Sequence, residues 1–184
     1  MFRNSERSTW PGRAGKLLAG AALVIGPIVA VAGPAEAQVP TCLGLPATII
    51  GTPGNDVLSG TPGDDVIIGL GGSDTIYGNG GNDTICGDDG NDVIHGGDGN
   101  DVIEGGNGDD VIYGDNGADT IDGGAGNDNV NGGADDDDLR GGDGNDQLAG
   151  NDGNDYLSGG NSNDYCNGGR GRDAADTCER SEGI

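Results

Sequence analysis

The chain has 184 residues, of which 42 are glycine and only six are aromatic: one Trp, one Phe and four Tyr. So few large apolar side chains exclude an ordinary globular core, and the many glycines raise the entropy that is lost on folding. The formal charge of −24 adds self-repulsion, excludes nucleic acids and anionic lipids as partners and favours cations.

Residues 1–37 differ from the rest of the chain in composition. Four basic residues lie within the first 16, and an apolar run follows from residue 17 to about residue 32. Ala35-Glu36-Ala37 then matches the A-x-A pattern that precedes signal-peptide cleavage. The apolar run is short for a membrane span, which needs about 20 residues. We therefore expect a signal peptide, a mature chain that begins at Gln38, an extracellular location and no membrane contact after cleavage.

Residues 38–50 are expected to form an N-terminal cap with one degenerate repeat, because Ile49 stands one nine-residue period before Leu58. The chain after the leader contains four cysteines: Cys42, Cys86, Cys166 and Cys178. An even number in a secreted protein favours disulfides, with three possible connectivities. Cys166 and Cys178 are the nearest pair in the sequence, so we predict this bridge and, by elimination, a Cys42–Cys86 bridge.

Fourteen nine-residue units follow one another without a break from residue 51 to residue 176. Position 1 is glycine in every unit, and position 4 is glycine in all but two, where Asp135 and Ser162 stand. Position 8 is small or aliphatic, from Leu58 to Ala175. Position 6 is always aspartate: Asp56, Asp65, Asp74, Asp83, Asp92, Asp101, Asp110, Asp119, Asp128, Asp137, Asp146, Asp155, Asp164 and Asp173. Such a composition is typical of disorder, but strict repeats can bury their apolar side chains by stacking.

The unit predicts an all-β fold. Glycines permit positive φ, so positions 1–6 are expected to form a tight turn, and the β-prone positions 7–9 a very short strand. Neighbouring strand residues point to opposite faces, so position 8 faces inward and positions 7 and 9 face outward. Two units then make one coil of 18 residues. The predicted fold is a parallel β-roll solenoid of nine-residue turn-strand repeats, with two sheets around a thin aliphatic seam.

Alternate turns stack along each edge of such a roll at about 4.8 Å, the spacing of strands. Carboxylates from units n and n+2 lie between them, together with backbone carbonyl groups. Calcium takes about 6–8 oxygens at roughly 2.3–2.6 Å, whereas zinc prefers His or Cys, so we predict calcium as the cofactor. Fourteen units allow at most twelve such pairs. Twelve calcium ions would carry +24, and residues 38–184 have four Arg and 30 acidic side chains, a formal charge of −26.

These units resemble the G-G-x-G-x-D-x-U-x nonapeptides of the RTX (repeats-in-toxin) family, with U large and aliphatic; residues 96–104, GGDGNDVIE, match in full. The resemblance covers residues 51–176. It implies a parallel β-roll that folds when calcium binds, and secretion from bacteria. It also implies that the fourteen aspartates at position 6 are side-chain ligands, with turn carbonyl groups completing the shell.

The chain departs from the family pattern in two ways. Many members lack an N-terminal signal and are exported by a C-terminal one, and the roll is usually attached to a toxin, protease, lipase or epimerase module. Here only residues 38–50 and 177–184 lie outside the repeats, so we expect no enzyme. Residues 177–184 are expected to cap the roll, because Ala175 and Arg172 weaken the seam and the metal site of the last unit.

We therefore expect a secreted, monomeric, non-enzymatic protein whose partners are calcium ions. Two alternatives stay open: a calcium-stabilised extracellular adhesive or spacer module with a glycan or protein partner, and an accessory subunit of a separately encoded secreted enzyme. His95, the only histidine, falls at an outward position 9 with no nucleophile arranged around it, so no catalytic residue is predicted. Tyr77 and Tyr113 share position 9, two coil rises apart on one face.

Overall fold

The computed structural model describes residues 39–184, and the predicted signal peptide with its cleavage site lies outside them. All regular structure in this part of the chain is β-strand. Residues 39–184 contain no helix long and apolar enough to cross a membrane.

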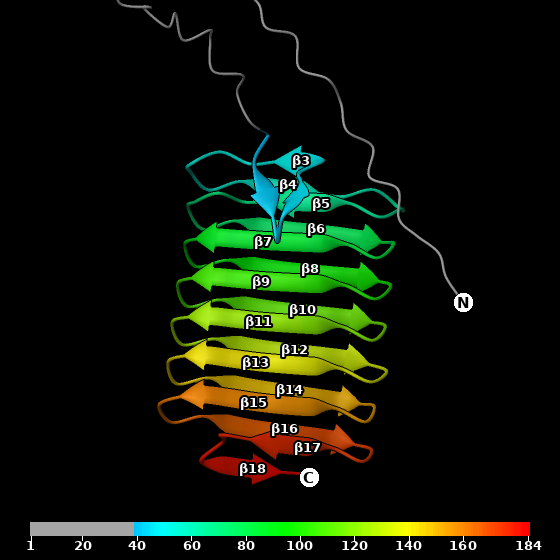
Figure 1. The fold of residues 1–184 in the computed structure, drawn as a ribbon, viewed down its shortest axis with the longest axis vertical. Coiled ribbons are helices and arrows are strands. Elements are labelled where there is room, and N and C mark those ends of the chain that lie inside the picture. The colour runs from blue at the N-terminus through cyan, green and yellow to red at the C-terminus, as the bar shows by residue number, and fades with distance from the viewer. Residues whose placement is uncertain (1–38) are drawn as a thin grey trace, which may run out of the picture. The chain divides into compact units, whose positions relative to one another are not determined.

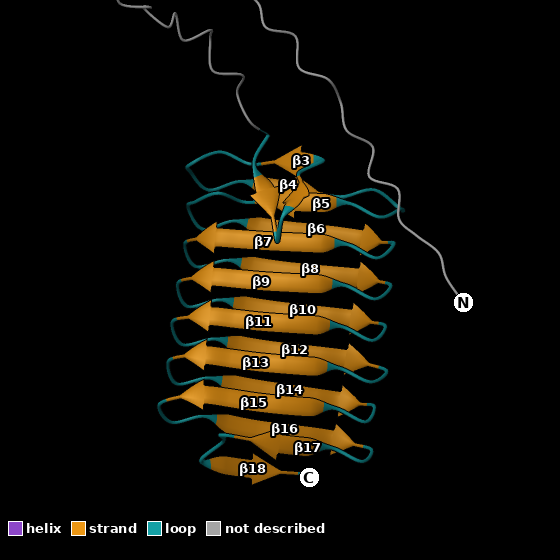
Figure 2. Cartoon of the chain, viewed as in Figure 1, coloured by secondary structure: helices purple, strands orange, loops and turns teal. Residues whose placement is uncertain are grey.

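Two parallel sheets of eight strands each form the body of the structure (Figures 1 and 2). The sheet of odd-numbered strands runs in the order β17-β15-β13-β11-β9-β7-β5-β3, and the sheet of even-numbered strands in the order β18-β16-β14-β12-β10-β8-β6-β4. The odd strands are β3 (Ile49–Ile50), β5 (Val66–Ile68), β7 (Thr84–Asp89), β9 (Val102–Asn107), β11 (Thr120–Ala125), β13 (Asp138–Asp143), β15 (Tyr156–Asn161) and β17 (Ala174–Asp176). The even strands are β4 (Val57–Ser59), β6 (Thr75–Gly80), β8 (Val93–Asp98), β10 (Val111–Asn116), β12 (Asn129–Ala134), β14 (Gln147–Asp152), β16 (Tyr165–Arg170) and β18 (Arg180–Glu182).

Consecutive strands alternate between the two sheets, so two units make one coil and the coils stack along the long axis in Figure 1. In the middle of the stack, Ile112 pairs with Ile94 on one side and Val130 on the other, each 18 residues away. Within the nine-residue units, the strand partner is therefore two units distant. The predictions of an all-β parallel β-roll with two units per coil are confirmed.

The strands are longer than predicted. From β6 to β16 each has six residues, because positions 1–3 of the following unit continue the strand and only positions 4–6 turn. The glycine at position 1 serves close approach within the strand rather than the turn. At Gly105, a Cβ atom would come within 2.5 Å of both Asp110 Oδ2 and the Gly123 carbonyl oxygen of the next coil. Only a residue without a side chain lets the coils stack this closely.

The seam between the sheets is a single row of buried side chains at position 8, as predicted. Each is at most 1% exposed: Ile67, Ile76, Ile85, Ile94, Ile103, Ile112, Ile121, Val130, Leu139, Leu148, Leu157 and Cys166. Ile49, Leu58, Ala175 and Cys178 pack against its two ends. Burying one such aliphatic side chain contributes about 1.5–3 kcal/mol, so the repeats share one thin, continuous core.

A second, smaller core lies under the N-terminal segment. The antiparallel pair β1 (Thr41–Cys42) and β2 (Leu45–Pro46) contributes Cys42, which packs with Ile68 and Cys86 and is disulfide-bonded to Cys86. Ile68 and Cys86 occupy position 9, yet they are 1% and 4% exposed. The expectation that position 9 is free on the outside is thus wrong at these two units, because the N-terminal segment covers them.

The C-terminal strand leaves the nine-residue phase. In β18, Ser181 pairs with Cys166, a separation of 15 residues instead of 18. The Cys166–Cys178 disulfide, with a Cα–Cα distance of 6.0 Å, joins the strand of the last full coil to this tail. Both predicted disulfides are therefore confirmed.

Candidate metal centre

The fourteen aspartates at position 6 form two columns along the two edges of the roll, each aspartate at the end of its turn. One column contains Asp56, Asp74, Asp92, Asp110, Asp128, Asp146 and Asp164; the other contains Asp65, Asp83, Asp101, Asp119, Asp137, Asp155 and Asp173. Asp74 to Asp164 are at most 3% exposed and Asp65 is 8% exposed, whereas Asp56 and Asp173, at opposite ends of the array, are half-buried. These carboxylates therefore point inward and are largely out of water.

From Asp74 to Asp173, one oxygen of each carboxylate holds neighbouring coils together. The backbone N–H of Asp92 donates to Asp110 Oδ1 at 2.8 Å, and Asp110 N–H donates to Asp128 Oδ1 at 2.8 Å. The same bond links successive aspartates from Asp56 to Asp164 in one column and from Asp65 to Asp173 in the other, at 2.7–3.0 Å. A hydrogen bond to a charged acceptor is stronger than one between neutral groups, so the columns stabilise the stack.

The other oxygen is buried and has no hydrogen-bond partner in twelve of the fourteen units. These atoms are the Oδ2 atoms of Asp74, Asp83, Asp92, Asp101, Asp110, Asp119, Asp128, Asp137, Asp146, Asp155, Asp164 and Asp173. Each buried, unsatisfied polar atom costs about 1–3 kcal/mol, and more when it is charged. Twelve such atoms in regular columns therefore favour a compensating cation or proton.

The donor set fits calcium. The available atoms are carboxylate and carbonyl oxygens, the hard ligands that this ion takes, and the position-1 glycine leaves room beside Oδ2. Among residues 39–184, no group of three or more His, Cys, Asp or Glu side chains is arranged to hold a metal. An ion in these turns would therefore depend on backbone carbonyl groups as well as on the carboxylates. Zinc, which prefers nitrogen and sulfur ligands, fits this arrangement poorly.

Burial and mutual repulsion raise the pKa of the carboxyls in the middle of the array. Desolvation is the main cause, and neighbouring carboxylates add to it. The pKa is raised from 3.8 to about 6 at Asp92, Asp101 and Asp128, and to about 7 at Asp110, Asp119 and Asp137. Keeping these groups ionised without a cation is therefore costly near neutral pH.

Asp56 and Asp65, in the first two units, differ from the other twelve. Their Oδ2 atoms accept hydrogen bonds from Thr52 and Thr61, respectively, which stand at position 2 of the same units. The backbone N–H of Thr61 is the main cause of a lowered pKa at Asp65, the opposite of the shift in the middle of the array. Because all fourteen units have aspartate at position 6, the position-6 pattern alone does not reveal this difference.

A further row of polar side chains lies on the exposed side of the turns at each edge and was not predicted. Position 5 is Asn or Asp in eleven of fourteen units, and in ten of these its side-chain oxygen accepts the N–H of position 5 in the next coil. Asn127 N–H donates to Asp109 Oδ1 at 2.7 Å, and Asn145 N–H donates to Asn127 Oδ1 at 3.1 Å. The recurring Gly-Asn-Asp signal could have identified it, since a short side-chain oxygen at a turn commonly accepts a backbone N–H.

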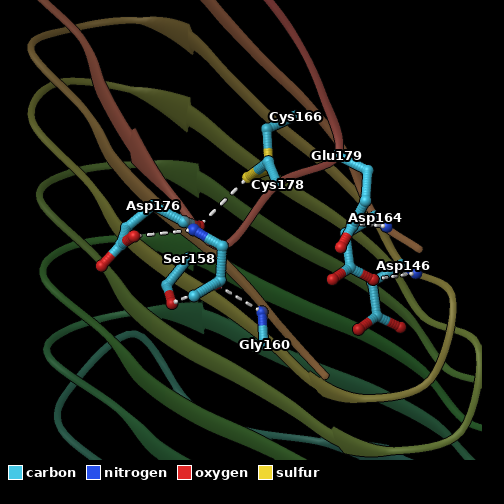
Figure 3. The surroundings of a disulfide bond; sticks show 9 residues. Asp146, Ser158, Gly160, Asp164, Cys166, Asp176, Cys178 and Glu179 are labelled. Carbon is cyan, nitrogen blue, oxygen red and sulfur yellow. Dashed lines mark hydrogen bonds between the residues drawn. A yellow bond between two sulfur atoms is a disulfide. The ribbon is translucent and has the colours of Figure 1, made fainter. Parts of the chain in front are cut away.

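Glu179, which lies outside the repeats, ends one aspartate column. Its Oε2 accepts the backbone N–H of Asp164 at 2.6 Å, the bond that the next aspartate would make in a continuing array. Figure 3 shows Glu179, Asp164 and Asp146 following one another along one edge, with the Cys166–Cys178 disulfide on the adjoining strand. The three-residue shift of β18 brings Glu179 to this place, so a search in the nine-residue phase could not find it.

The outward position-9 rings form a short stack. The ring centroid of His95 lies 5.3 Å from that of Tyr77 and 4.6 Å from that of Tyr113, with nearly parallel planes. His95 Nδ1 also lies 3.2 Å from Asp115 Oδ2. Both faces of the His95 ring are thus occupied by tyrosines, so the ring is held as a surface contact between three coils.

Two parallel sheets coiled around one aliphatic seam, with a column of buried carboxylates at each edge, define a β-roll with acidic turns. A family model described as the RTX calcium-binding nonapeptide repeat matches the chain four times, at residues 50–85, 87–121, 113–148 and 140–174. These matches span more than half of the chain, which therefore belongs to the RTX calcium-binding repeat family. No curated protein matches the chain.

Proposed function

We propose that this chain is a secreted, non-enzymatic calcium-binding β-roll that folds when calcium binds between its stacked turns. The observation that carries the proposal is the set of twelve buried Oδ2 atoms without a hydrogen-bond partner, from Asp74 to Asp173. The family to which the chain belongs binds calcium through such repeats. We assign these twelve aspartates as side-chain ligands; the other two predicted ligands, Asp56 and Asp65, are already hydrogen-bonded by threonine.

The charge of the chain supports the same assignment. Twelve calcium ions would carry +24, close to the formal charge of −26 for residues 38–184 with four Arg and 30 acidic side chains. Without the ions, folding would bury two columns of carboxylates, and the like charges within each column would lie close together and away from water. The metal-free chain is therefore expected to stay unfolded, so that the free energy of calcium binding supports folding.

The experiment that tests this function compares the chain in a chelator with the chain in millimolar calcium. Circular dichroism is expected to change from disordered to β-structure, and the hydrodynamic radius to fall. Magnesium at the same concentration serves as the control, because its strict octahedral geometry and tightly held water suit these turns poorly. A chain that has the same circular dichroism in chelator and in calcium would rule out calcium-dependent folding.

Secretion rests on separate observations. The leader pattern of residues 1–37 and the disulfides Cys42–Cys86 and Cys166–Cys178 favour export to an oxidising compartment. N-terminal sequencing of the protein recovered from culture medium is expected to begin at Gln38. Retention of the full-length chain inside the cell would contradict this part of the proposal.

The adhesive, spacer and accessory-subunit alternatives share the calcium-supported roll and differ in what its outer faces contact. No contact among residues 39–184 favours one of them. A glycan array and affinity capture from the culture medium, both with calcium present, would separate them from a protein whose partners are calcium ions alone.

A further inference from the structure

The first two turns have a different backbone from the other twelve. In the twelve later units, position 2 always has positive φ: Leu70, Asn79, Asp88, Gly97, Gly106, Asp115, Gly124, Gly133, Gly142, Asn151, Gly160 and Gly169. Thr52 and Thr61 at the same position stay outside this left-handed region. Each is followed by proline, Pro53 and Pro62, which biases the preceding residue toward extended conformations. The Gly-Thr-Pro-Gly start of these two units therefore produces another kind of turn.

In these turns, threonine satisfies the carboxylate oxygen that is left free elsewhere. Thr52 donates its backbone N–H to Asp56 Oδ2 at 2.6 Å, and its hydroxyl lies 2.8 Å from the same oxygen. Thr61 makes the same two contacts with Asp65 Oδ2, also at 2.6 and 2.8 Å. The two units that lack positive φ at position 2 are thus the two whose Oδ2 has partners. Because the same contacts occur in both units, they follow from the shared Gly-Thr-Pro-Gly sequence.

These contacts oppose cation binding. A carboxylate oxygen has two lone-pair directions, and an N–H and an O–H together occupy both at Oδ2. Both donors also bring partial positive charge to the oxygen that a cation would have to contact. The carboxylate sits differently as well: a Cβ on Gly51 would lie 3.1 Å from Asp56 Oδ2, compared with 2.5 Å between a Cβ on Gly105 and Asp110 Oδ2.

Other metal-free contacts order the same end of the roll. Thr48 donates its hydroxyl to the aspartate column, 3.1 Å from Asp65 Oδ1, and its backbone N–H to Val66 O at 2.8 Å. The Cys42–Cys86 disulfide and the small core that contains Ile68 fix the N-terminal segment over strands β5 and β7. This part of the chain therefore has covalent, apolar and hydrogen-bonded support that does not depend on an ion.

We propose that Thr52 and Thr61 take the place of calcium in the first two turns, which makes residues 41–68 a metal-independent end on which the calcium-dependent coils stack. The inference rests on the proposed function for the other twelve turns. It also reduces the number of calcium-ligating aspartates from fourteen to twelve, because Asp56 and Asp65 are then structural residues that bind no ion.

The test counts bound calcium ions by native mass spectrometry of the disulfide-bonded chain at saturating calcium. The unmodified chain is expected to bind at most twelve. The double variant Asp56→Asn, Asp65→Asn is expected to bind as many ions as the unmodified chain, whereas the matched variant Asp101→Asn, Asp110→Asn is expected to lose about two. Because pairing of turns limits the array to twelve sites in either case, the comparison of the two variants decides: an equal loss in both would overturn the inference. An unmodified chain that binds no calcium would instead overturn the proposed function.

A second pair of measurements covers the case in which the first variant fails to fold. Thr52→Val, Thr61→Val keeps the backbone donors and the shape but removes the hydroxyls, and its ion count is expected to be unchanged. A loss of two ions would show that the threonines are ligands and would refute the inference. Hydrogen exchange of the unmodified chain at sub-saturating calcium is expected to protect residues 48–68 before residues 102–125. Protection in the reverse order would also count against it.

Discussion

At the scale of single residues, each of the twelve position-6 aspartates from Asp74 to Asp173 has two separate tasks. Its Oδ1 accepts a backbone N–H from the neighbouring coil, and its Oδ2 supplies negative charge to the interior of the turn. An asparagine can retain the first task but loses the charge of the second. The effect of a substitution therefore depends on the neighbours that an aspartate has in its column.

Asp101→Ala is expected to raise the calcium concentration needed for half-maximal folding several-fold, and more than Asp173→Ala does. Asp101 lies in the middle of its column and accepts the N–H of Asp83, whereas Asp173 ends the same column and is half-buried. Calcium titrations followed by circular dichroism measure the midpoints. Asp98→Ala, which removes an exposed charge from the end of β8 in the same unit, is the control and should have little effect. Equal midpoints for the Asp101 and Asp173 variants would contradict a terminal role for the last unit.

The two columns of buried carboxylates could be predicted from the sequence at the level of residue type, because the turn repeats its aspartate in strict phase. Which oxygen is left without a partner could not be predicted. Thr52 and Thr61 are ordinary turn residues in the sequence, and their effect on Asp56 and Asp65 depends on a backbone conformation that Pro53 and Pro62 only bias.

At the scale of the strand, stability comes from the seam. Ile103→Ala in β9 is expected to lower the free energy of unfolding by about 2–5 kcal/mol, because it opens a cavity in a fully buried row. Val102→Ala, the adjacent outward residue with 38% exposure, is expected to change it by no more than about 0.5 kcal/mol. Urea unfolding at saturating calcium measures both. Similar losses in the two variants would mean that the seam is not the main apolar support.

The tail strand β18 is expected to depend on Glu179. Glu179→Ala leaves the backbone N–H of Asp164 without its acceptor, a loss of about 1–3 kcal/mol at a charged partner, and should speed amide exchange in residues 174–182. Glu179→Gln keeps an oxygen at the end of the side chain and is expected to restore most of the protection. Unchanged exchange in the alanine variant would show that the disulfide alone holds the tail.

Strand lengths illustrate what the unit pattern leaves undecided. Glycines at positions 1 and 2 predict a turn, yet in β6 to β16 the strand continues through position 3, although position 2 has positive φ. The reason is non-local: the next coil lies so close at position 1 that a Cβ would meet its carbonyl oxygen, as at Gly105 with Gly123. A glycine selected for close approach and one selected for positive φ are identical in the sequence.

At the scale of the whole molecule, the raised pKa values predict that protons can partly replace calcium. Where the folded-state pKa is raised from 3.8 to about 7, as at Asp110, Asp119 and Asp137, the folded chain binds more protons than the unfolded one. The resulting stability is fully present below pH 4 and is lost as the pH rises through about 7. The metal-free chain is therefore expected to gain β-structure as the pH falls from 7 to 4.

Circular dichroism in a chelator across this pH range measures the effect. As a control, the calcium concentration needed for half-maximal folding is measured over the same range, where acidification should hinder calcium-dependent folding. Because protons compete with calcium for the same oxygens, the calcium concentration needed for folding should rise as the pH falls from 7 to 6. A metal-free chain that loses structure on acidification would contradict both the buried columns and their assignment.

The amino-acid sequence by itself determined the nine-residue period, the two-unit coil, the inward seam and the two columns of aspartates. These features follow from local conformation and from side-chain alternation, which repeat identically in every unit. The tertiary structure decided which carboxylate oxygens have partners, how far the strands extend, that the N-terminal segment covers Ile68 and Cys86, and that Glu179 ends a column. Each depends on groups from different coils or from outside the repeats, whose distances are set only when the coils are stacked.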